Sequence, residues 1–136
     1  MKNRGDLMAL EIKNSGCNLE IGGSCFVVYP DSPEYLEKLE HFSKGAQEKA
    51  RLFSGATDGI AEKTRDVCTF CLTAIDELLG PGAADSIFDG KTVGMMTLLE
   101  VLTYIKTESG RYLQTSGQRL QQLSGNRAQR RQKTKK

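Results

Sequence analysis

Apolar side chains recur at three- and four-residue steps through three long stretches of this chain, and no other feature constrains its fold more. The first stretch begins at Pro33, directly after Ser32, and ends before Ser54-Gly55-Ala56. Serine caps free backbone N–H groups, and proline at the first helical position loses no hydrogen bond, so this pair is typical of a helix start. The spacing therefore predicts an amphipathic helix of about 20 residues. Its apolar stripe comprises Tyr35, Leu36, Leu39, Phe42, Ala46 and Ala50.

A second amphipathic helix is predicted to follow, with Thr57 or Asp58 as its cap. Gly80-Pro81-Gly82 stops it, because glycine ends helices and proline cannot continue them. A short turn of helix from Ala83 to Phe88 should come next and end at Gly90. The buried face of the second helix is expected to carry Ile60, Val67, Cys68, Cys71, Leu72, Ile75, Leu78 and Leu79.

Thr92 is predicted to open a third long helix with apolar residues nearly all round it. We therefore expect much of this helix to be buried, within the domain or against a partner. After Thr107 the chain becomes rich in Gln, Ser and Gly, which favours a broken helix. From Gly125 it has one Ala and no larger apolar side chain, so this end is expected to be disordered when free. The apolar set of the third helix is Met95, Met96, Leu98, Leu99, Val101, Leu102, Tyr104 and Ile105.

Residues 17–29 have the character of two short β-strands around a tight turn. Leu19 and Ile21 alternate with polar residues, and a run rich in β-formers follows Gly22-Gly23. Glycine reaches positive φ without a Cβ clash, so the pair predicts a two-residue hairpin turn. The predicted fold is thus α+β and mainly α, with an N-terminal β-hairpin packed on about three helices.

Charge divides the chain into an acidic body and a basic tail. Residues 1–108 hold all 17 acidic residues and 11 basic ones, a net charge of −6, while residues 109–136 hold 8 basic residues and no acid. Two segments of opposite net charge in one chain are more typical of a protein that binds partners than of a catalyst. We expect a flexible segment over 1–16, an α+β domain over 17–107 and a tail over 108–136. The basic cluster of the tail is Arg127, Arg130, Arg131, Lys133, Lys135 and Lys136.

The cysteines, the histidine and the clustered carboxylates do not occur in the sequence patterns of catalytic or metal sites. Cys68 and Cys71 share an apolar helix face, so they should pack in the core, where Cys25 could meet Cys71. The spacing of Cys17 and Cys25 does not suit a zinc knuckle, and a zinc or thiol protein remains the third alternative. The single histidine, His41, has no serine or cysteine in a sequence context that would make it the base of a nucleophilic site. The carboxylates at 76–77, 85 and 89 are expected to cap helices or face solvent. We expect no enzyme activity, no metal and no cofactor.

The sequence also lacks the marks of a membrane or secreted protein. No apolar run approaches the ~18 residues that span a bilayer. The N-terminus has no apolar stretch followed by a small-residue cleavage site. We therefore expect no membrane contact, a cytoplasmic location and reduced cysteines.

Residues 74–105 carry a recognisable series of short motifs. A helix ends in Ile-Asp…Leu-Gly-x-Gly, an Ile-Phe-x-Gly turn follows, and a last helix ends in Leu-Glu-Val-Leu-x-Tyr-Ile. This series resembles the tail assembly chaperones of long-tailed phages and prophages of Gram-positive bacteria. The preceding hairpin, the helix capped by Ser-Pro and the basic ending at 126–131 are similar too, so the resemblance covers roughly residues 17–131.

The resemblance implies a non-enzymatic protein of the bacterial host cytoplasm that binds the tape-measure protein, a long and largely apolar helical chain. It would keep that chain soluble, help recruit tail-tube subunits and then leave; self-association is possible. Members of the family are often followed by a frameshifted extension. The methionines of the third helix favour such a role, because their flexible apolar side chains adapt to partners of different shape. The expected partner-binding residues are Ile87, Phe88, Met95, Met96 and Leu99.

The main alternative is a nucleic-acid-associated protein that binds through its basic tail. Clustered Lys and Arg can neutralise phosphates and release counterions. The tail has no interleaved aromatic residues to stack on bases, so nucleic acid is the weaker hypothesis.

Deleting residues 126–136 should not shift the thermal unfolding midpoint beyond experimental error. The segment offers almost nothing apolar to bury, so its removal costs the core nothing. Differential scanning calorimetry of the full and shortened chains checks this. A drop of several degrees that shrinks as salt rises would show instead that the tail docks on the acidic body.

Overall fold

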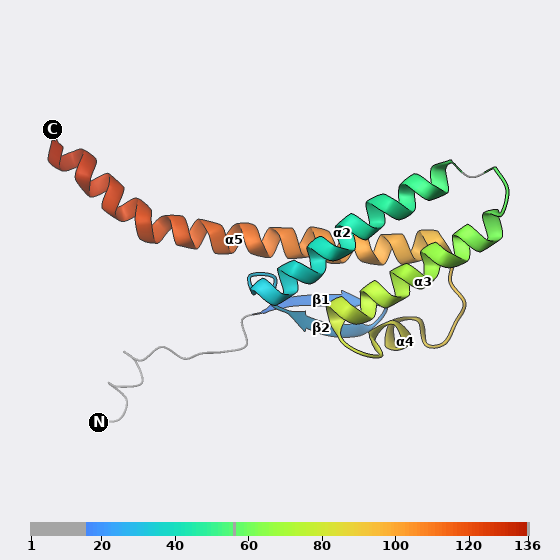
Figure 1. Cartoon of the computed structure of the whole chain (residues 1–136). Helices are drawn as coiled ribbons and strands as arrows, with labels where there is room; N and C mark the ends of the chain where they lie inside the picture. Colours follow the sequence, from blue (N-terminus) through green and yellow to red (C-terminus); the bar gives the residue numbers. More distant parts are fainter. Residues whose placement is uncertain (1–15, 56, 136) are drawn as a thin grey trace, which may run out of the picture.

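The computed structural model describes the backbone of residues 16–55 and 57–135, and side chains as far as residue 124. Over these residues the chain is mainly helical, with one antiparallel hairpin ahead of the helices, which confirms the predicted α+β class (Figure 1). The predicted flexible segment over 1–16 lies, apart from Gly16, outside the described residues. In order, the elements are β1 (Cys17–Ile21), β2 (Ser24–Val28), α2 (Pro33–Ser54), α3 (Ile60–Leu79), α4 (Ala83–Phe88) and α5 (Met95–Lys135).

The hairpin forms where the paired glycines predict it. Gly22 and Gly23 have φ angles of 58° and 83°, the left-handed conformation that a two-residue hairpin turn requires. The register pairs Cys17 with Val28 and Ile21 with Ser24. Side chains alternate across a strand, so β1 turns Cys17, Leu19 and Ile21 toward the core and its other residues toward solvent.

Helix α2 starts at the predicted Ser-Pro pair. The Ser32 hydroxyl accepts a hydrogen bond from the Tyr35 N–H at 3.3 Å, and Pro33 occupies the first turn. Tyr35 is the buried residue of α2, and its Oη shares a 2.9 Å hydrogen bond with the Oγ of Ser109, which is also buried. The start of α2 is thereby joined to the middle of α5.

Helix α3 differs from the prediction at its start and on its face. Gly59 precedes it in a left-handed conformation, and among the described residues no side-chain hydrogen bond caps it, so the assignment to Thr57 or Asp58 is wrong. Ile60 and Leu72, expected on the buried stripe, are exposed. Each residue turns a helix by about 100°, so Leu72 lies at the edge of the face that packs. That face consists of Cys71, Ala74, Ile75 and Leu78.

Asp76 holds the connection from α3 to α4. Its carbonyl accepts the Gly80 N–H at 2.8 Å, and its carboxylate Oδ1 accepts the Ala84 N–H at 2.9 Å. The carboxylate therefore satisfies a free N–H at the start of α4, as the prediction of a capping role requires.

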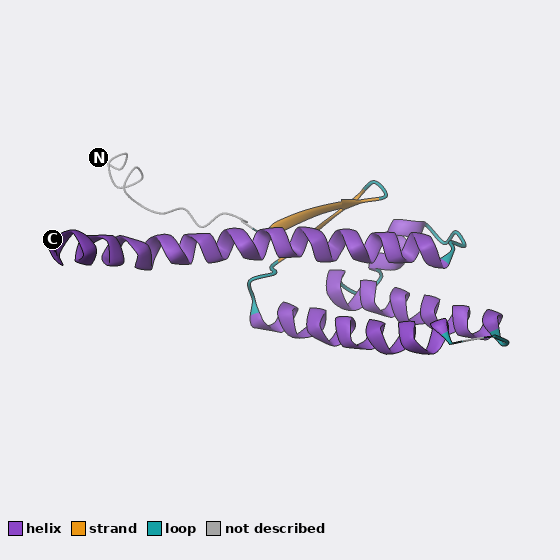
Figure 2. Ribbon diagram, turned by 90° about the horizontal axis from the view of Figure 1, so that it is seen from above, coloured by secondary structure: helices purple, strands orange, loops and turns teal. Residues whose placement is uncertain are grey.

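The core lies where the hairpin, α3 and α5 meet. Figure 2 shows the hairpin on one side of α5 and the α2–α3 pair on the other. Helix α3 contacts α2, α4, α5 and β2, and α5 also contacts β1. Five apolar side chains at this junction are almost completely covered: Leu19, Ile75, Leu98, Leu102 and Ile105.

Helix α5 buries one face rather than its whole circumference. Leu98, Leu102 and Ile105 are buried, whereas Met96, Leu99 and Tyr104 are exposed. Of the apolar residues predicted nearly all round this helix, the single chain therefore buries those on one face, because the hairpin and α3 cover only part of the circumference.

The C-terminal part of α5 also differs from the sequence prediction. The helix begins at Met95, three residues after the expected Thr92, and runs without a break to Lys135, where a broken helix and a disordered end were predicted. Gln, Arg, Lys and Leu favour helix and no proline interrupts them, which offsets the scattered glycines. The boundary expected between 107 and 108 lies inside α5, and contact with the body continues to Ser116, whose Oγ is 3.4 Å from the Asp31 carboxylate.

Replacing Tyr35 by Phe should lower the free energy of unfolding by about 1–2 kcal/mol, because it leaves the buried Ser109 hydroxyl without its partner. The double variant Tyr35→Phe/Ser109→Ala should lie closer to wild type than the sum of the two single changes, since both polar groups are then gone. Tyr104→Phe, at an exposed 3.4 Å contact with the Glu20 N–H, is the control and should change stability by less than about 0.5 kcal/mol. Urea denaturation measures the wild type and the four variants, and single-variant effects that add exactly in the double variant would contradict the coupling of Tyr35 and Ser109.

Candidate partner-binding groove

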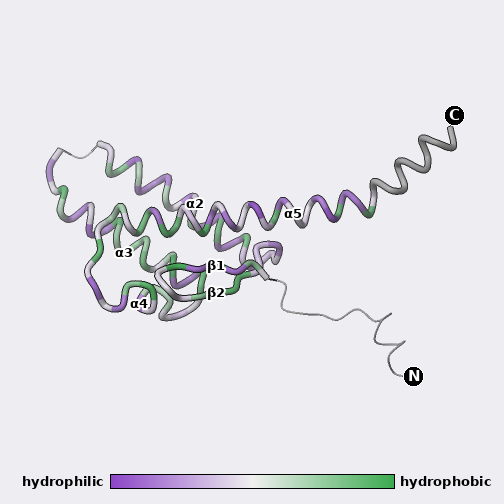
Figure 3. The backbone as a smooth tube through the Cα atoms, turned by 180° about the vertical axis from the view of Figure 1, so that it is seen from behind, coloured by the Kyte–Doolittle hydropathy of each residue, from purple (hydrophilic) through white to green (hydrophobic). Residues whose placement is uncertain are grey.

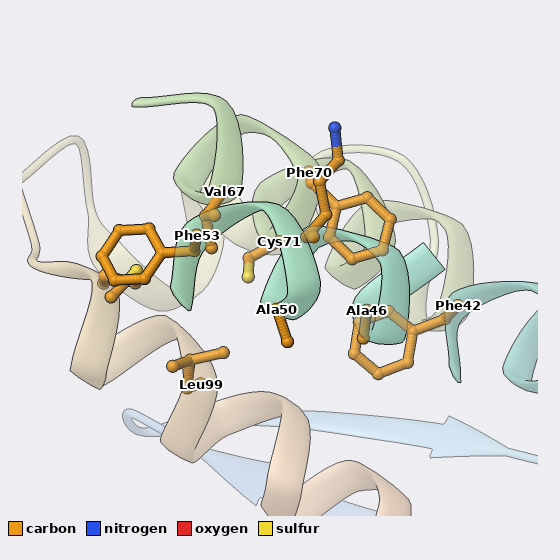
Figure 4. Close-up of a pocket in the computed structure, with 10 residues that line it drawn as sticks. Phe42, Ala46, Ala50, Phe53, Val67, Phe70, Cys71 and Leu99 are labelled. Atoms are coloured by element: carbon orange, nitrogen blue, oxygen red, sulfur yellow. The ribbon is translucent and has the colours of Figure 1, made fainter. Parts of the chain in front are cut away.

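An apolar groove lies between α2, α3 and the first turns of α5 (Figure 4). Its volume is about 210 Å³. We call it the α2–α3–α5 groove. Ten residues line it, of which Lys49 alone is charged: Phe42, Ala46, Lys49, Ala50, Phe53, Val67, Phe70, Cys71, Met95 and Leu99.

Small residues on α2 leave the space that the groove occupies. Ala46 and Ala50 lie one turn apart where larger side chains would fill the hollow. Gly45 matters in the same way, because a Cβ at this position would lie 2.7 Å from the ring of Phe70. That close approach lets Phe70 stack on Phe42, with 5.6 Å between ring centroids and 15° between the planes. The stacked pair forms an aromatic wall at one end of the groove.

The one charged side chain of the lining is already paired. Lys49 Nζ donates to the Asp66 carboxylate at 2.7 Å and lies 5.9 Å from the centroid of the Phe70 ring. The ammonium is therefore held at the rim by an acidic group and an aromatic face. The groove presents an almost wholly apolar surface to whatever enters it.

Cys71 lies in the lining as a buried thiol. Burial, with a smaller contribution from Cys68, raises its pKa from 9.0 to about 11. At neutral pH the group is protonated, and a thiol in that state is a poor nucleophile and a poor metal ligand. Cys71 therefore contributes packing, as its position on the apolar stripe predicts, while Cys68 is half-buried.

The other two cysteines lie on the hairpin. Cys25 is exposed, so the expected meeting of Cys25 and Cys71 in the core is wrong. The reason is strand alternation: Val28 points into the core, and Cys25, three residues earlier, faces the opposite side. Cys17 is buried, and desolvation together with the nearby Glu108 carboxylate raises its pKa.

The structure separates the five predicted partner-binding residues. Met95 and Leu99 line the groove, and Met96, with 69% of its surface exposed, lies on the adjoining face of α5. Ile87 and Phe88 are half-buried on α4 and pack against the core. Phe88 lines a separate hollow with Cys68, Leu72 and Leu98. The side chains of the predicted basic cluster, from Arg127 to Lys136, lie outside the described residues.

Two further features, a metal site and a helix that could span a membrane, are absent from the described part of the chain. There, no three His, Cys, Asp or Glu side chains come together as a metal site would require. Over the same residues, no helix is both long enough and apolar enough to cross a bilayer.

A family of unknown function, DUF6673, matches residues 26–134. The chain belongs to the DUF6673 family. The match begins within β2 and takes in α2, α3, α4 and nearly all of α5, so it contains every residue of the groove. Comparison with curated proteins and with solved structures gave no match.

Sequence reasoning placed most of the lining of the groove of this DUF6673 protein on apolar helix faces but did not predict a groove between them. It assigned Phe42, Ala46, Ala50 and Val67 to the apolar stripes of the first two helices. The available signal was the pair of alanines, since two small residues in the middle of a stripe leave a gap between helices. Phe53 and Phe70 fell outside the predicted stripes and give no such signal.

Thiol labelling should discriminate sharply between the cysteines. At neutral pH iodoacetamide should modify the exposed Cys25 first, while Cys71 should react only when the chain unfolds, because it is buried and protonated. Peptide mapping by mass spectrometry after timed labelling measures this. Labelling in denaturant is the control and should modify all four cysteines. Equal rates at Cys25 and Cys71 in the folded protein would contradict the assignment.

Proposed function

We propose that this DUF6673 protein is a tail assembly chaperone of a long-tailed phage or prophage. In this role it binds the tape-measure protein in the host cytoplasm, keeps it in solution and helps to recruit tail-tube subunits. It performs no catalysis and needs no cofactor. The proposal is supported by the motif series of residues 74–105 and carried by one observation, the open apolar groove between α2, α3 and α5.

The size and chemistry of the groove favour a helical peptide over a small molecule. Pockets for drug-sized ligands usually measure about 300–1,000 Å³ and place several polar groups to orient the ligand. The α2–α3–α5 groove is smaller, at about 210 Å³, and its lining is almost wholly apolar. A surface of this kind suits the apolar side chains that an amphipathic helix presents at three- and four-residue spacing.

The methionines at the start of α5 suit a long client of irregular sequence. Met95 lines the groove and Met96 lies exposed beside it. Methionine is unbranched and polarisable, so it adapts to side chains of different shape, and promiscuous binding surfaces use it for that reason. A tape-measure chain offers many similar but unequal apolar segments, which is the kind of client such a surface accommodates.

The test is co-expression with a tape-measure fragment that precipitates when expressed alone. Ala50 is an exposed residue of α2 that lines the groove, so Ala50→Glu places a carboxylate in the groove. The helix should tolerate the change, because Glu favours helix nearly as well as Ala. This variant should lose the ability to keep the fragment in the soluble fraction. Ala61→Glu, the same change at an exposed position of α3 outside the groove, is the matched control and should behave as wild type.

Met96→Asp tests the adjoining face without touching the core and should also weaken solubilisation. Phe88→Asp is less suitable, because Phe88 packs against the core and the change should destabilise the fold as well. Circular dichroism and thermal midpoints check that each variant is folded. If Ala50→Glu and Met96→Asp both fold and both keep the fragment soluble, the groove is not the client site.

A further inference from the structure

Helix α5 carries a second apolar surface, away from the groove. Figure 1 shows α5 extending well past the other elements, and Figure 3 shows apolar segments recurring along that extension. We call residues 113–124 of α5 the arm. Every residue from 117 to 124 is exposed. Three leucines stand out on the arm, with exposed fractions of 39% for Leu113, 67% for Leu120 and 75% for Leu123.

These leucines continue the stripe that α5 buries in the core. At about 100° per residue, Leu113, Leu120 and Leu123 fall on the same side of the helix as Leu98, Leu102 and Ile105. Leu113 and Leu120 are seven residues apart and Leu123 follows three later, which is the spacing of a helix–helix seam. The interface that α5 makes with the body therefore continues onto a segment where it has no cover among the described residues.

Packing would further stabilise the arm as a helix. Gly117 lies within the arm and Gly110 and Gly125 flank it, and each glycine lowers helix stability. Most helices of this propensity are held by tertiary contacts on an apolar face rather than by their own hydrogen bonds. A partner helix against the three leucines would supply that contact.

The net charge of the C-terminal part of α5 indicates which kind of partner the arm binds. The arm itself holds one basic residue, Arg119, but residues 125–135 of the same helix add five more, and there is no acid from residue 109 onward. A second copy would bring the same excess of basic residues with no acid to balance it, which disfavours self-pairing. The leucines have no role against phosphates, and no aromatic residue follows Tyr112 to stack on bases. We propose that the arm is a docking helix for a partner's amphipathic α-helix whose apolar seam is flanked by Asp and Glu.

This proposal does not depend on the groove. It assigns a second partner surface to α5, about 30 Å from the first when the 21 residues from Leu99 to Leu120 are counted at 1.5 Å each. A chaperone that holds one protein and recruits another needs two such surfaces, but the arm can bind an acidic helix whether or not the groove binds a client.

The experiment uses the full chain and two designed peptides of about four heptads, both with Ile and Leu at the seam. One has Glu at the flanking positions and the other has Lys. By fluorescence anisotropy, the Glu peptide should bind at least about tenfold more tightly than the Lys peptide, and added salt should weaken it. Leu120→Asp/Leu123→Asp should reduce Glu-peptide binding by at least about tenfold.

Gln118→Asp/Gln122→Asp is the matched control, because it adds the same charge on the opposite face of the arm. It should leave binding within about threefold of wild type, which separates loss of the seam from loss of positive charge. All four positions are exposed, so every variant should keep the wild-type thermal midpoint.

Several results would overturn the proposal. One is equal binding of the Glu and Lys peptides, and another is equal loss in the leucine and glutamine variants. Concentration-dependent dimerisation abolished by the leucine changes would show that a second copy occupies the seam. Tighter binding of a generic DNA duplex than of the Glu peptide would identify a nucleic-acid surface. Ala50→Glu should retain peptide binding; if it does not, the peptide lies in the groove, and the arm proposal fails while the proposed function stands.

Discussion

Leu98, Leu102 and Ile105 pack α5 against the hairpin and α3, and the positions of all other elements follow from that contact. Leu19 of the hairpin and Ile75 of α3 are buried in the same core cluster as this stripe. One turn further along, Ser109 joins the start of α2 to α5 through Tyr35. A small domain has few such contacts, so the loss of one large side chain from this stripe would disturb every layer.

The same contact leaves the groove open. Because α5 turns its buried stripe toward the hairpin and α3, it contributes only Met95 and Leu99, at its first turns, to the lining of the groove. Ala46 and Ala50 are too small to fill the space that remains, and Gly45 allows Phe70 to stack on Phe42 rather than to fill it. The groove is thus a consequence of residue size on one helix and helix orientation on another.

Local chemistry predicted most elements, because it acts within a few residues. The Gly22-Gly23 turn, the Ser32 cap and the Gly80 stop lie where the residue types require them. What the sequence did not yield depends on distance along the chain. Helical periodicity shows that α2, α3 and α5 each have an apolar face, but it does not show which face meets which. Cys25 was therefore misplaced, and periodicity alone did not show that Met95 and Leu99 share a groove with Phe53 and Phe70 while Phe88 lies elsewhere.

The two proposed surfaces of α5 differ in the forces on which they rely, and this has a consequence for how partners would bind. The groove is apolar and its one cation is paired with Asp66, so binding there should respond little to salt. The arm sets exposed leucines in a positive field, so binding there should weaken as salt rises. A partner held at both surfaces must span about 30 Å of helix, and moderate salt should release it from the arm before the groove. At moderate salt a single partner held at both surfaces should therefore stay bound through the groove. If two partners are bound, the one on the arm should leave the complex and the one in the groove should remain.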